Sequence, residues 1–275
     1  MRRIFLILGV TLFAMVTPAP AQRAYTADLR EWTSRAGRML HGYYAAHGVA
    51  VAAVRERSGG RELPPLYAGG PYDDGWAFSF GSLEGDSAFV IRYGVIVTGS
   101  GTVAQFNEFP GRRVASPYHT LAARALARVQ DDFQRIRTEQ RFTAQEYRFA
   151  VLPFPRGELT AFVSPAQTRP GVTLAGSDMM VSLARDDVRI LDRTRFHHRV
   201  IELPTVPPPN AEGAALIVPD APAPSPVDVL HAMERKAPLF VLANRGAYLI
   251  GPDGSIEVLP EDDPRSRALR AHGGP

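Results

Sequence analysis

Arg148-Phe-Ala-Val-Leu-Pro153 opens the stretch that decides the fold. The stretch continues through Leu159-Thr-Ala-Phe-Val163, Met179-Met-Val-Ser-Leu-Ala184, Val188-Arg-Ile-Leu191 and Arg195-Phe-His-His-Arg-Val-Ile-Glu-Leu203. Each segment contains a short apolar run, and turn-forming residues separate one run from the next. Apolar runs of this length, punctuated by turns, are typical of strands in an antiparallel sheet. We therefore expect the core of a sheet between residues 148 and 203.

Turns and side-chain alternation inside this stretch favour the same arrangement. Residues 153–157 and 185–187 have the composition of hairpin connections. Met179, Val181 and Leu183 alternate with smaller or more polar neighbours. Because successive side chains of a strand point to opposite faces, this alternation predicts that one face is buried.

Two segments outside the stretch carry the spacing of amphipathic helices. Apolar residues recur at steps of three and four across Asp28–His47, and again across Tyr118–Gln140. Gly48 fits the end of the first helix, and Val49–Val54 then has the composition of a strand. The chain is thus predicted to be α+β, with a mainly antiparallel sheet and two long amphipathic helices.

Short apolar runs elsewhere predict further elements. Residues 76–80, 88–97 and 102–106 are separated by turns, as in a β-meander. Towards the C-terminus, residues 226–235 have the pattern of a short helix, and residues 239–258 contain three strand-like runs. These elements add a second group of strands to the predicted sheet core.

A proline-rich segment shapes the predicted domain organisation. Eight prolines fall in the 23 residues from Pro204 to Pro226, so this segment should run extended over the surface, outside any sheet. We expect a single α+β domain over residues 22–260, with a subdivision near residue 147 as the alternative. Residues 261–275 are polar and are expected to form a disordered tail.

The N-terminus has the features of a signal peptide, predicted over residues 1–21. Arg2 and Arg3 precede the 13-residue apolar run Ile4–Val16, and Ala19-Pro20-Ala21 matches the small-residue cleavage pattern. We expect Sec-dependent export with cleavage after Ala21; the paired arginines leave twin-arginine export as the alternative. The mature protein would be periplasmic or secreted, with no stable membrane anchor, because the run is too short to span a bilayer core of roughly 30 Å.

Composition excludes several classes of protein. The 275 residues include no cysteine, which excludes disulfides, thiolate metal sites and a cysteine nucleophile. The formal net charge is +3, and subtracting Arg2 and Arg3 of the signal peptide leaves +1. Lys236 is the only lysine, and the arginines are interspersed with acidic residues. A nucleic-acid partner, which requires clustered cations, is therefore not expected.

Adjacent histidines supply the sharpest chemical hypothesis. His197 and His198, with Glu202 and His231, are the candidates for a catalytic or a metal site. Histidine and carboxylate are suitable ligands for zinc and suitable general bases. The alternative is that these histidines are structural or lie on the surface.

Strand geometry limits that hypothesis. If residues 197–202 form a strand, His197 and His198 point to opposite faces. His198 and Glu202 would share a face, about 13 Å apart at 3.3 Å per residue. Ligands bound to one metal at about 2 Å must lie much closer than this. At most one of the two histidines can therefore face a site.

Sequence motifs that would identify an activity are lacking. Thr98-Gly-Ser100-Gly-Thr102 lacks the complete nucleophile elbow, and no phosphate-binding loop, dinucleotide fingerprint or H-E-x-x-H motif occurs. No cofactor is therefore predicted, beyond the zinc hypothesis. A group of aromatic residues has the spacing of core positions, with a ligand groove as the alternative: Tyr43, Tyr44, Trp76, Phe78 and Phe80.

These observations favour an exported, non-catalytic protein that binds an envelope component or a small ligand. The alternative is a periplasmic hydrolase, with or without a metal, that uses His197 or His198 together with Glu202 or His231. No residue pattern identifies the substrate, the partner or the oligomeric state, so the choice depends on where the histidines lie relative to a pocket.

Overall fold

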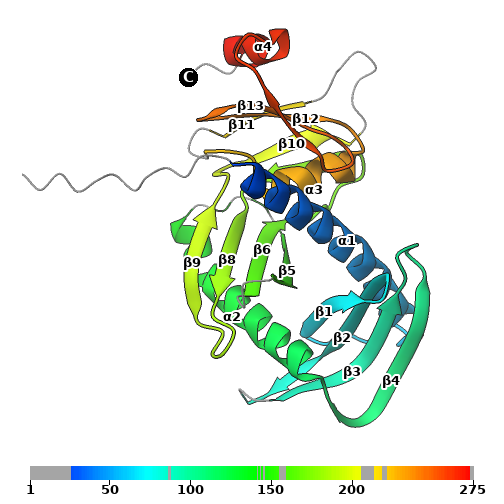
Figure 1. The fold of residues 1–275 in the computed structure, drawn as a ribbon. Helices are drawn as coiled ribbons and strands as arrows, with labels where there is room; N and C mark the ends of the chain where they lie inside the picture. The colour runs from blue at the N-terminus through cyan, green and yellow to red at the C-terminus, as the bar shows by residue number, and fades with distance from the viewer. Residues whose placement is uncertain are drawn as a thin grey trace, which may run out of the picture.

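The computed structural model describes residues 26–85, 88–140, 142, 144, 146–154, 159–205, 214–218 and 222–272, with the backbone alone for 214–218 and 272. The predicted signal peptide and its cleavage site lie outside these residues. Described elements comprise four helices and fourteen strands, arranged in four sheets (Figure 1). None of the helices in the described ranges is both long and apolar enough to cross a bilayer.

Helix α1, Ala27–Arg57, is longer than predicted. Thr26 caps its N-terminus by accepting a hydrogen bond from the Leu29 backbone N–H, and Ser58 is its C-cap. Gly48 does not end the helix, and the predicted strand Val49–Val54 is helical instead. The reason is tertiary: residues in this last part of α1 pack against the first sheet at helical spacing, namely Ala46, Ala50 and Val54.

The first sheet is the predicted β-meander. It consists of β1 Leu66–Tyr72, β2 Gly75–Glu84, β3 Ala88–Val97 and β4 Val103–Val114, all antiparallel and in sequence order. Alternate residues of β3 are buried on one face. Phe89 and Ile91 on this face belong to the core around α2, whereas Tyr93, Val95 and Val97 belong to the core around α1.

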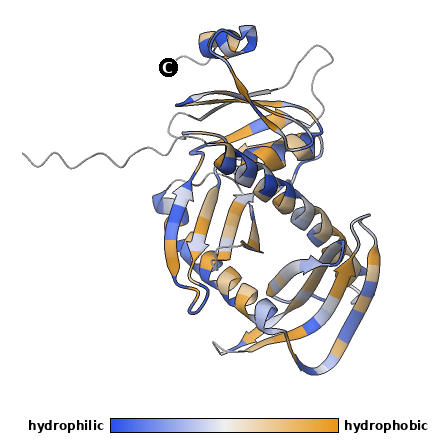
Figure 2. Cartoon of the chain, viewed as in Figure 1, coloured by the Kyte–Doolittle hydropathy of each residue, from blue (hydrophilic) through white to orange (hydrophobic). Residues whose placement is uncertain are grey.

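Helix α2, Pro117–Glu139, and the second sheet form the part of the chain that the sequence predicts best. The sheet contains β5 Tyr147–Pro153, β6 Leu159–Pro165, β8 Met179–Leu183 and β9 Ile190–Arg195 in an antiparallel order. The β8–β9 turn lies where it was predicted, and residues 155–158 of the β5–β6 connection lie outside the described residues. At the sheet edge, β9 is largely hydrophilic (Figure 2).

Both faces of the second sheet are covered. The buried alternate residues of β8 belong to the core around α2, as predicted: Met179, Val181 and Leu183. The opposite face, including Ala150, Leu152 and Phe162, packs against α1 and α3. Residues on this second face therefore point towards the space between the two helices.

Two strands of the stretch leave this sheet and pair with each other. They are β7 Val172–Gly176 and β10 Val200–Pro204, which form an antiparallel two-stranded sheet. Residues 196–199, which include the adjacent histidines, connect β9 to β10 and are not part of a strand.

The proline-rich segment and the C-terminal tail differ from the prediction. Within the segment, β11 Ala214–Val218 pairs in parallel with β12 Leu239–Ala243, because its five residues contain no proline. Strands β13 Gly246–Ile250 and β14 Ile256–Leu259 complete this sheet. The expected disordered tail contains helix α4, Pro264–His272, whose Leu269 packs on the sheet.

Helix α3, Pro226–Arg235, lies between α1 and the last sheet (Figure 1). Val227 and Leu230 belong to the core around α1, and Val229 and Ala232 belong to the core of the last sheet. The fold is thus mixed α and β with almost wholly antiparallel sheets, as predicted in outline. A pair of long amphipathic helices is not confirmed; α1 is long, and it contacts the first sheet, β5 and α3.

Candidate functional site

His197, one of the predicted site residues, has a carboxylate on each side of its ring. Its Nδ1 lies 2.8 and 2.9 Å from the two carboxylate oxygens of Asp178. On the other side of the ring, Nε2 lies 3.1 Å from Asp228 Oδ1. The imidazole is therefore held between two carboxylates, neither of which was among the predicted site residues.

Local backbone structure positions both carboxylates. Asp178 follows Gly176 and Ser177, which have φ values of 75° and 51° and turn the chain from β7 into β8. Asp228 is the third residue of α3 and forms a capping box with Ser225, whose N–H and hydroxyl both donate to Asp228 Oδ2. Since the capping box uses Oδ2, Oδ1 is left to face His197.

This cluster is closed to solvent. The side chains of His197, Asp178 and Asp228 are 3%, 0% and 1% exposed, respectively. Burial alone would lower the pKa of His197, but the two carboxylates raise this pKa well above its ordinary value of 6.5. His197 is thus a buried imidazolium that joins the β9–β10 connection to β8 and α3, and it has neither the access nor the free base form that a general base requires.

The other predicted residues lie apart from His197. His198 is exposed, and Glu202 is an exposed residue of β10 that pairs with Arg169. His231 is fully buried on α3, with Nδ1 3.5 Å from Glu234. Among the described residues, no three histidine, aspartate or glutamate side chains lie close enough to share a metal ion.

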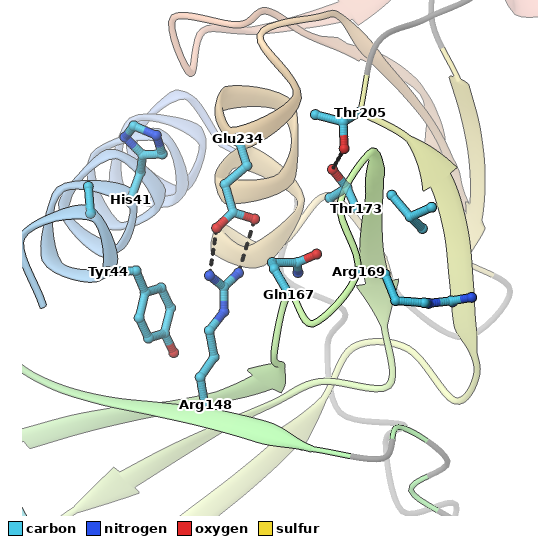
Figure 3. Close-up of a pocket in the computed structure, with 10 residues that line it drawn as sticks. His41, Tyr44, Arg148, Gln167, Arg169, Thr173, Thr205 and Glu234 are labelled. Atoms are coloured by element: carbon cyan, nitrogen blue, oxygen red, sulfur yellow. Dashed lines mark hydrogen bonds and ion pairs between the residues drawn. The ribbon is translucent and has the colours of Figure 1, made fainter. Parts of the chain in front are cut away.

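A pocket of about 410 Å³ opens between α1, α3, β5 and the loop before β7 (Figure 3). Eight of its ten lining residues have polar side chains, and they come from segments far apart in the sequence: His41, Tyr44, Ala45, Arg148, Gln167, Arg169, Val172, Thr173, Thr205 and Glu234. None of the predicted site residues lines it, although Glu234 contacts His231 and Arg169 contacts Glu202.

An ion pair forms the inner wall of the pocket. Arg148 binds Glu234 through two parallel bonds of 2.6 and 3.0 Å, and its Nε donates to Ser164 Oγ at 3.2 Å. The guanidinium also lies over the Tyr44 ring, 4.2 Å from the ring centroid. Both charged side chains are 18% exposed, so the pair is mostly buried but reaches the pocket.

Strand and helix geometry bring these residues together. Arg148 shares a face of β5 with Ala150 and Leu152, and this face packs against α1 and α3. Glu234 lies in the last turn of α3, opposite that face. Gln167 fixes the loop before β7, which forms another wall of the pocket. Its side-chain amide donates to the Leu174 carbonyl at 2.9 Å and accepts from the Leu174 N–H at 2.7 Å.

The charge states in the pocket follow from these contacts. Burial raises the pKa of Glu234, but proximity to His231 and Arg148 outweighs it and holds this pKa at about 2. Burial is also the main influence on His41, where it lowers the pKa below 6.5. At neutral pH the pocket therefore contains the Arg148 cation, the Glu234 anion and a neutral His41.

A serine and a histidine also meet elsewhere. Ser79 Oγ of β2 lies 2.8 Å from His119 Nδ1, in the first turn of α2. Ser79 is only 6% exposed, and neither residue lines the pocket. This pair is therefore best explained as a buried hydroxyl with a hydrogen-bond partner.

The chain matches no protein family, no curated protein and no solved structure with which it was compared. Function must therefore be inferred from the pocket. Sequence reasoning missed Arg148 and Glu234, whose partnership is not local. A usable signal existed for Asp228, since Ser225 and Asp228 have capping-box spacing at the start of a predicted helix.

Proposed function

We propose that this protein is exported and binds a small polar molecule in the pocket, without transforming it. The main support is the pocket itself, whose inner wall is an ion pair already held in place by Ser164 and Tyr44. A volume of about 410 Å³ lies within the range of roughly 300–1,000 Å³ that is usual for small-molecule sites. Pre-organised polar groups reduce the entropy lost on binding.

Binding is favoured over catalysis because the lining residues are poorly suited to proton transfer. A general acid or base works best with a pKa near the operating pH. Glu234, with a pKa of about 2 and two bonds to Arg148, stays ionised at neutral pH. His41 could accept a proton, but its lowered pKa makes it a weak base. These groups can donate and accept hydrogen bonds while keeping their charge.

The hydrolase alternative has less support. His197 is enclosed and protonated between two carboxylates, so it cannot take a proton from a substrate. His198 and Glu202 are exposed, and Glu202 pairs with Arg169. His231 is buried behind Glu234. None of these four residues lines the pocket, so we favour binding over the hydrolase alternative.

Two variants on the same helix test binding at the pocket. Ala45 is an exposed lining residue, so A45W should block the cavity, whereas Ala52 is exposed on α1 but does not line it. We expect small polar molecules that raise the melting temperature of the wild type to act equally on A52W and to lose their effect on A45W. A library that stabilises neither the wild type nor A52W, or a compound that still stabilises A45W, would contradict the proposal.

Export has a separate test. The arginines, the apolar run and the small residues before Gln22 support a cleaved Sec signal. Fractionation of a bacterial host that expresses the full chain should recover the protein from the periplasm or the medium, with Gln22 as its first residue. Recovery of uncleaved protein from the cytoplasm would contradict export and leave the pocket proposal intact.

A further inference from the structure

The charge of the pocket lining indicates which class of ligand it would accept. Arg148 and Arg169 each contribute one positive charge and Glu234 contributes one negative charge, while His41 is neutral. The lining therefore carries a net charge of +1. In a partly enclosed site this excess favours a ligand with a single negative charge.

Arg169 is the cation best able to bind an anionic group. Its present partner, Glu202, lies outside the lining, and the side chains of the pair are 52% and 57% exposed. Exposed ion pairs contribute only about 0–1 kcal/mol, so Arg169 can exchange this partner at little cost. If the Arg169 side chain turned from Glu202 into the pocket, its planar guanidinium would match a ligand carboxylate in shape.

The Arg148–Glu234 pair retains hydrogen-bonding capacity towards a polar ligand. A guanidinium has five N–H groups, and the bonds to Ser164 and Glu234 use three of those of Arg148. A carboxylate has about four acceptor positions, and Arg148 occupies two of those of Glu234. The pair can therefore donate to ligand oxygens and accept from ligand hydroxyls.

Two hydroxyls line the opposite side of the pocket. Thr173 Oγ1 and Thr205 Oγ1 lie 3.3 Å apart, on β7 and just after β10 (Figure 3). They form a hydrogen bond with each other, which uses one of their two O–H donors, so the pair can still donate one hydrogen bond and accept others. A ligand with several hydroxyls would thus find partners on both walls, which an inorganic ion much smaller than the cavity could not reach.

We infer that the ligand is a small hydroxylated monocarboxylate, a sugar acid or a molecule of similar chemistry, whose carboxylate binds Arg169 and whose hydroxyls bind Glu234, Arg148 and the two threonines. This inference rests on the proposed binding function. A phosphate ester carries close to two negative charges at neutral pH, and the Glu234 carboxylate repels the second. A neutral sugar would leave Arg169 paired with Glu202 and would gain nothing from the charge of the lining.

Calorimetry with four probes tests the ligand class: D-glucuronate, its neutral relative D-glucose, D-glucose 6-phosphate, and a disaccharide whose single acidic sugar is a glucuronate at the non-reducing end. We expect glucuronate to bind at millimolar concentration or below, and glucose and its phosphate to bind at least tenfold more weakly. Binding of the disaccharide as well would identify an acidic sugar at a chain end as the source, and binding of glucuronate alone would identify a free sugar acid. Equal or tighter binding of glucose or its phosphate would overturn the class, as would no binding of any probe.

An exposed ion pair elsewhere provides a matched control for the role of Arg169. The Arg189–Asp187 pair has side chains 65% and 54% exposed, much like the Arg169–Glu202 pair. R169Q should weaken glucuronate binding by about ten- to a hundredfold, the loss of a hydrogen bond to a charged group, and R189Q should leave it unchanged. An unchanged affinity in R169Q would refute the assignment. If a compound of another class binds the wild type and A52W but not A45W, the proposed binding function holds and only the inferred ligand class is refuted.

Discussion

Replacing His197 should destabilise the protein strongly at neutral pH and weakly at alkaline pH. In H197Q, Asp178 and Asp228 would remain buried near each other without the cation between them. Their side chains are 0% and 1% exposed, so water cannot take its place. Removing one partner of a buried charge pair costs about 3–5 kcal/mol. At about 2–4 °C per kcal/mol, the melting temperature should fall by about 6–20 °C.

The pH dependence distinguishes this mechanism from a simple loss of packing. The pKa of His197 is raised in the folded state, above its ordinary value of 6.5. Its charge therefore contributes fully to stability below pH 6.5, and this contribution is lost as the pH rises through the folded pKa. The stability difference between wild type and H197Q should thus shrink as the pH is raised from 6 towards 10.

Thermal denaturation followed by circular dichroism at several pH values provides the assay. H198Q is the matched control, because the adjacent His198 side chain is exposed; we expect it to stay within about 0.5 kcal/mol of the wild type. A loss in H197Q below about 1 kcal/mol, or a difference that does not change with pH, would refute the charged-cluster interpretation.

Three further predictions concern packing and charge. A Cβ at Gly37 would lie 2.4 Å from Val229 Cβ, so G37A should destabilise the contact between α1 and α3 by about 1–3 kcal/mol in urea denaturation. The same change at Gly48, with nothing within 4 Å, should stabilise α1 by about 0.5–1 kcal/mol; equal effects at the two sites would contradict the packing. Asp132, 1% exposed, accepts two bonds of 2.7 Å from Arg193, so D132N should cost about 1.5–3 kcal/mol. The Arg193 hydrogen bonds hold the pKa of Asp132 below 3.8 in the folded protein. The stability difference between wild type and D132N should therefore decrease as the pH falls through this lowered pKa. A difference that stays constant down to pH 2 would contradict the role of the Asp132 charge.

Local sequence patterns predicted most of the second sheet because its strands pair with near neighbours in the chain. The alternation of Met179, Val181 and Leu183 and the turn at 185–187 are both local features, and both are found in the structure. The predictions failed where distant packing decides. Residues 49–54 of α1 are helical because they pack on the first sheet, and β11 exists because β12 pairs with it.

For the site, the sequence separated His197 from His198 by assuming a strand. Residues 196–199 form a connection instead, and this connection places His197 inside and His198 outside. The sequence did not identify the residues that contact His197 or Arg148. Asp178 and Asp228 are 19 and 31 positions from His197 along the chain, as counted on the sequence. Arg148 meets Glu234 across 86 positions. Two charged residues this far apart in the chain produce no recognisable spacing pattern in one sequence, because only the fold brings them into contact.

By itself, the sequence determined most strands of the first two sheets, the absence of cysteine chemistry and the expectation of export. Each follows from local composition or from spacing within one element. The tertiary structure alone decided which polar groups face one another. It enclosed His197 between two carboxylates, and it left Arg148 and Glu234 at the wall of a pocket built from α1, α3 and β5. The physical reason is that a buried charge requires a partner, and the fold decides which residue supplies it.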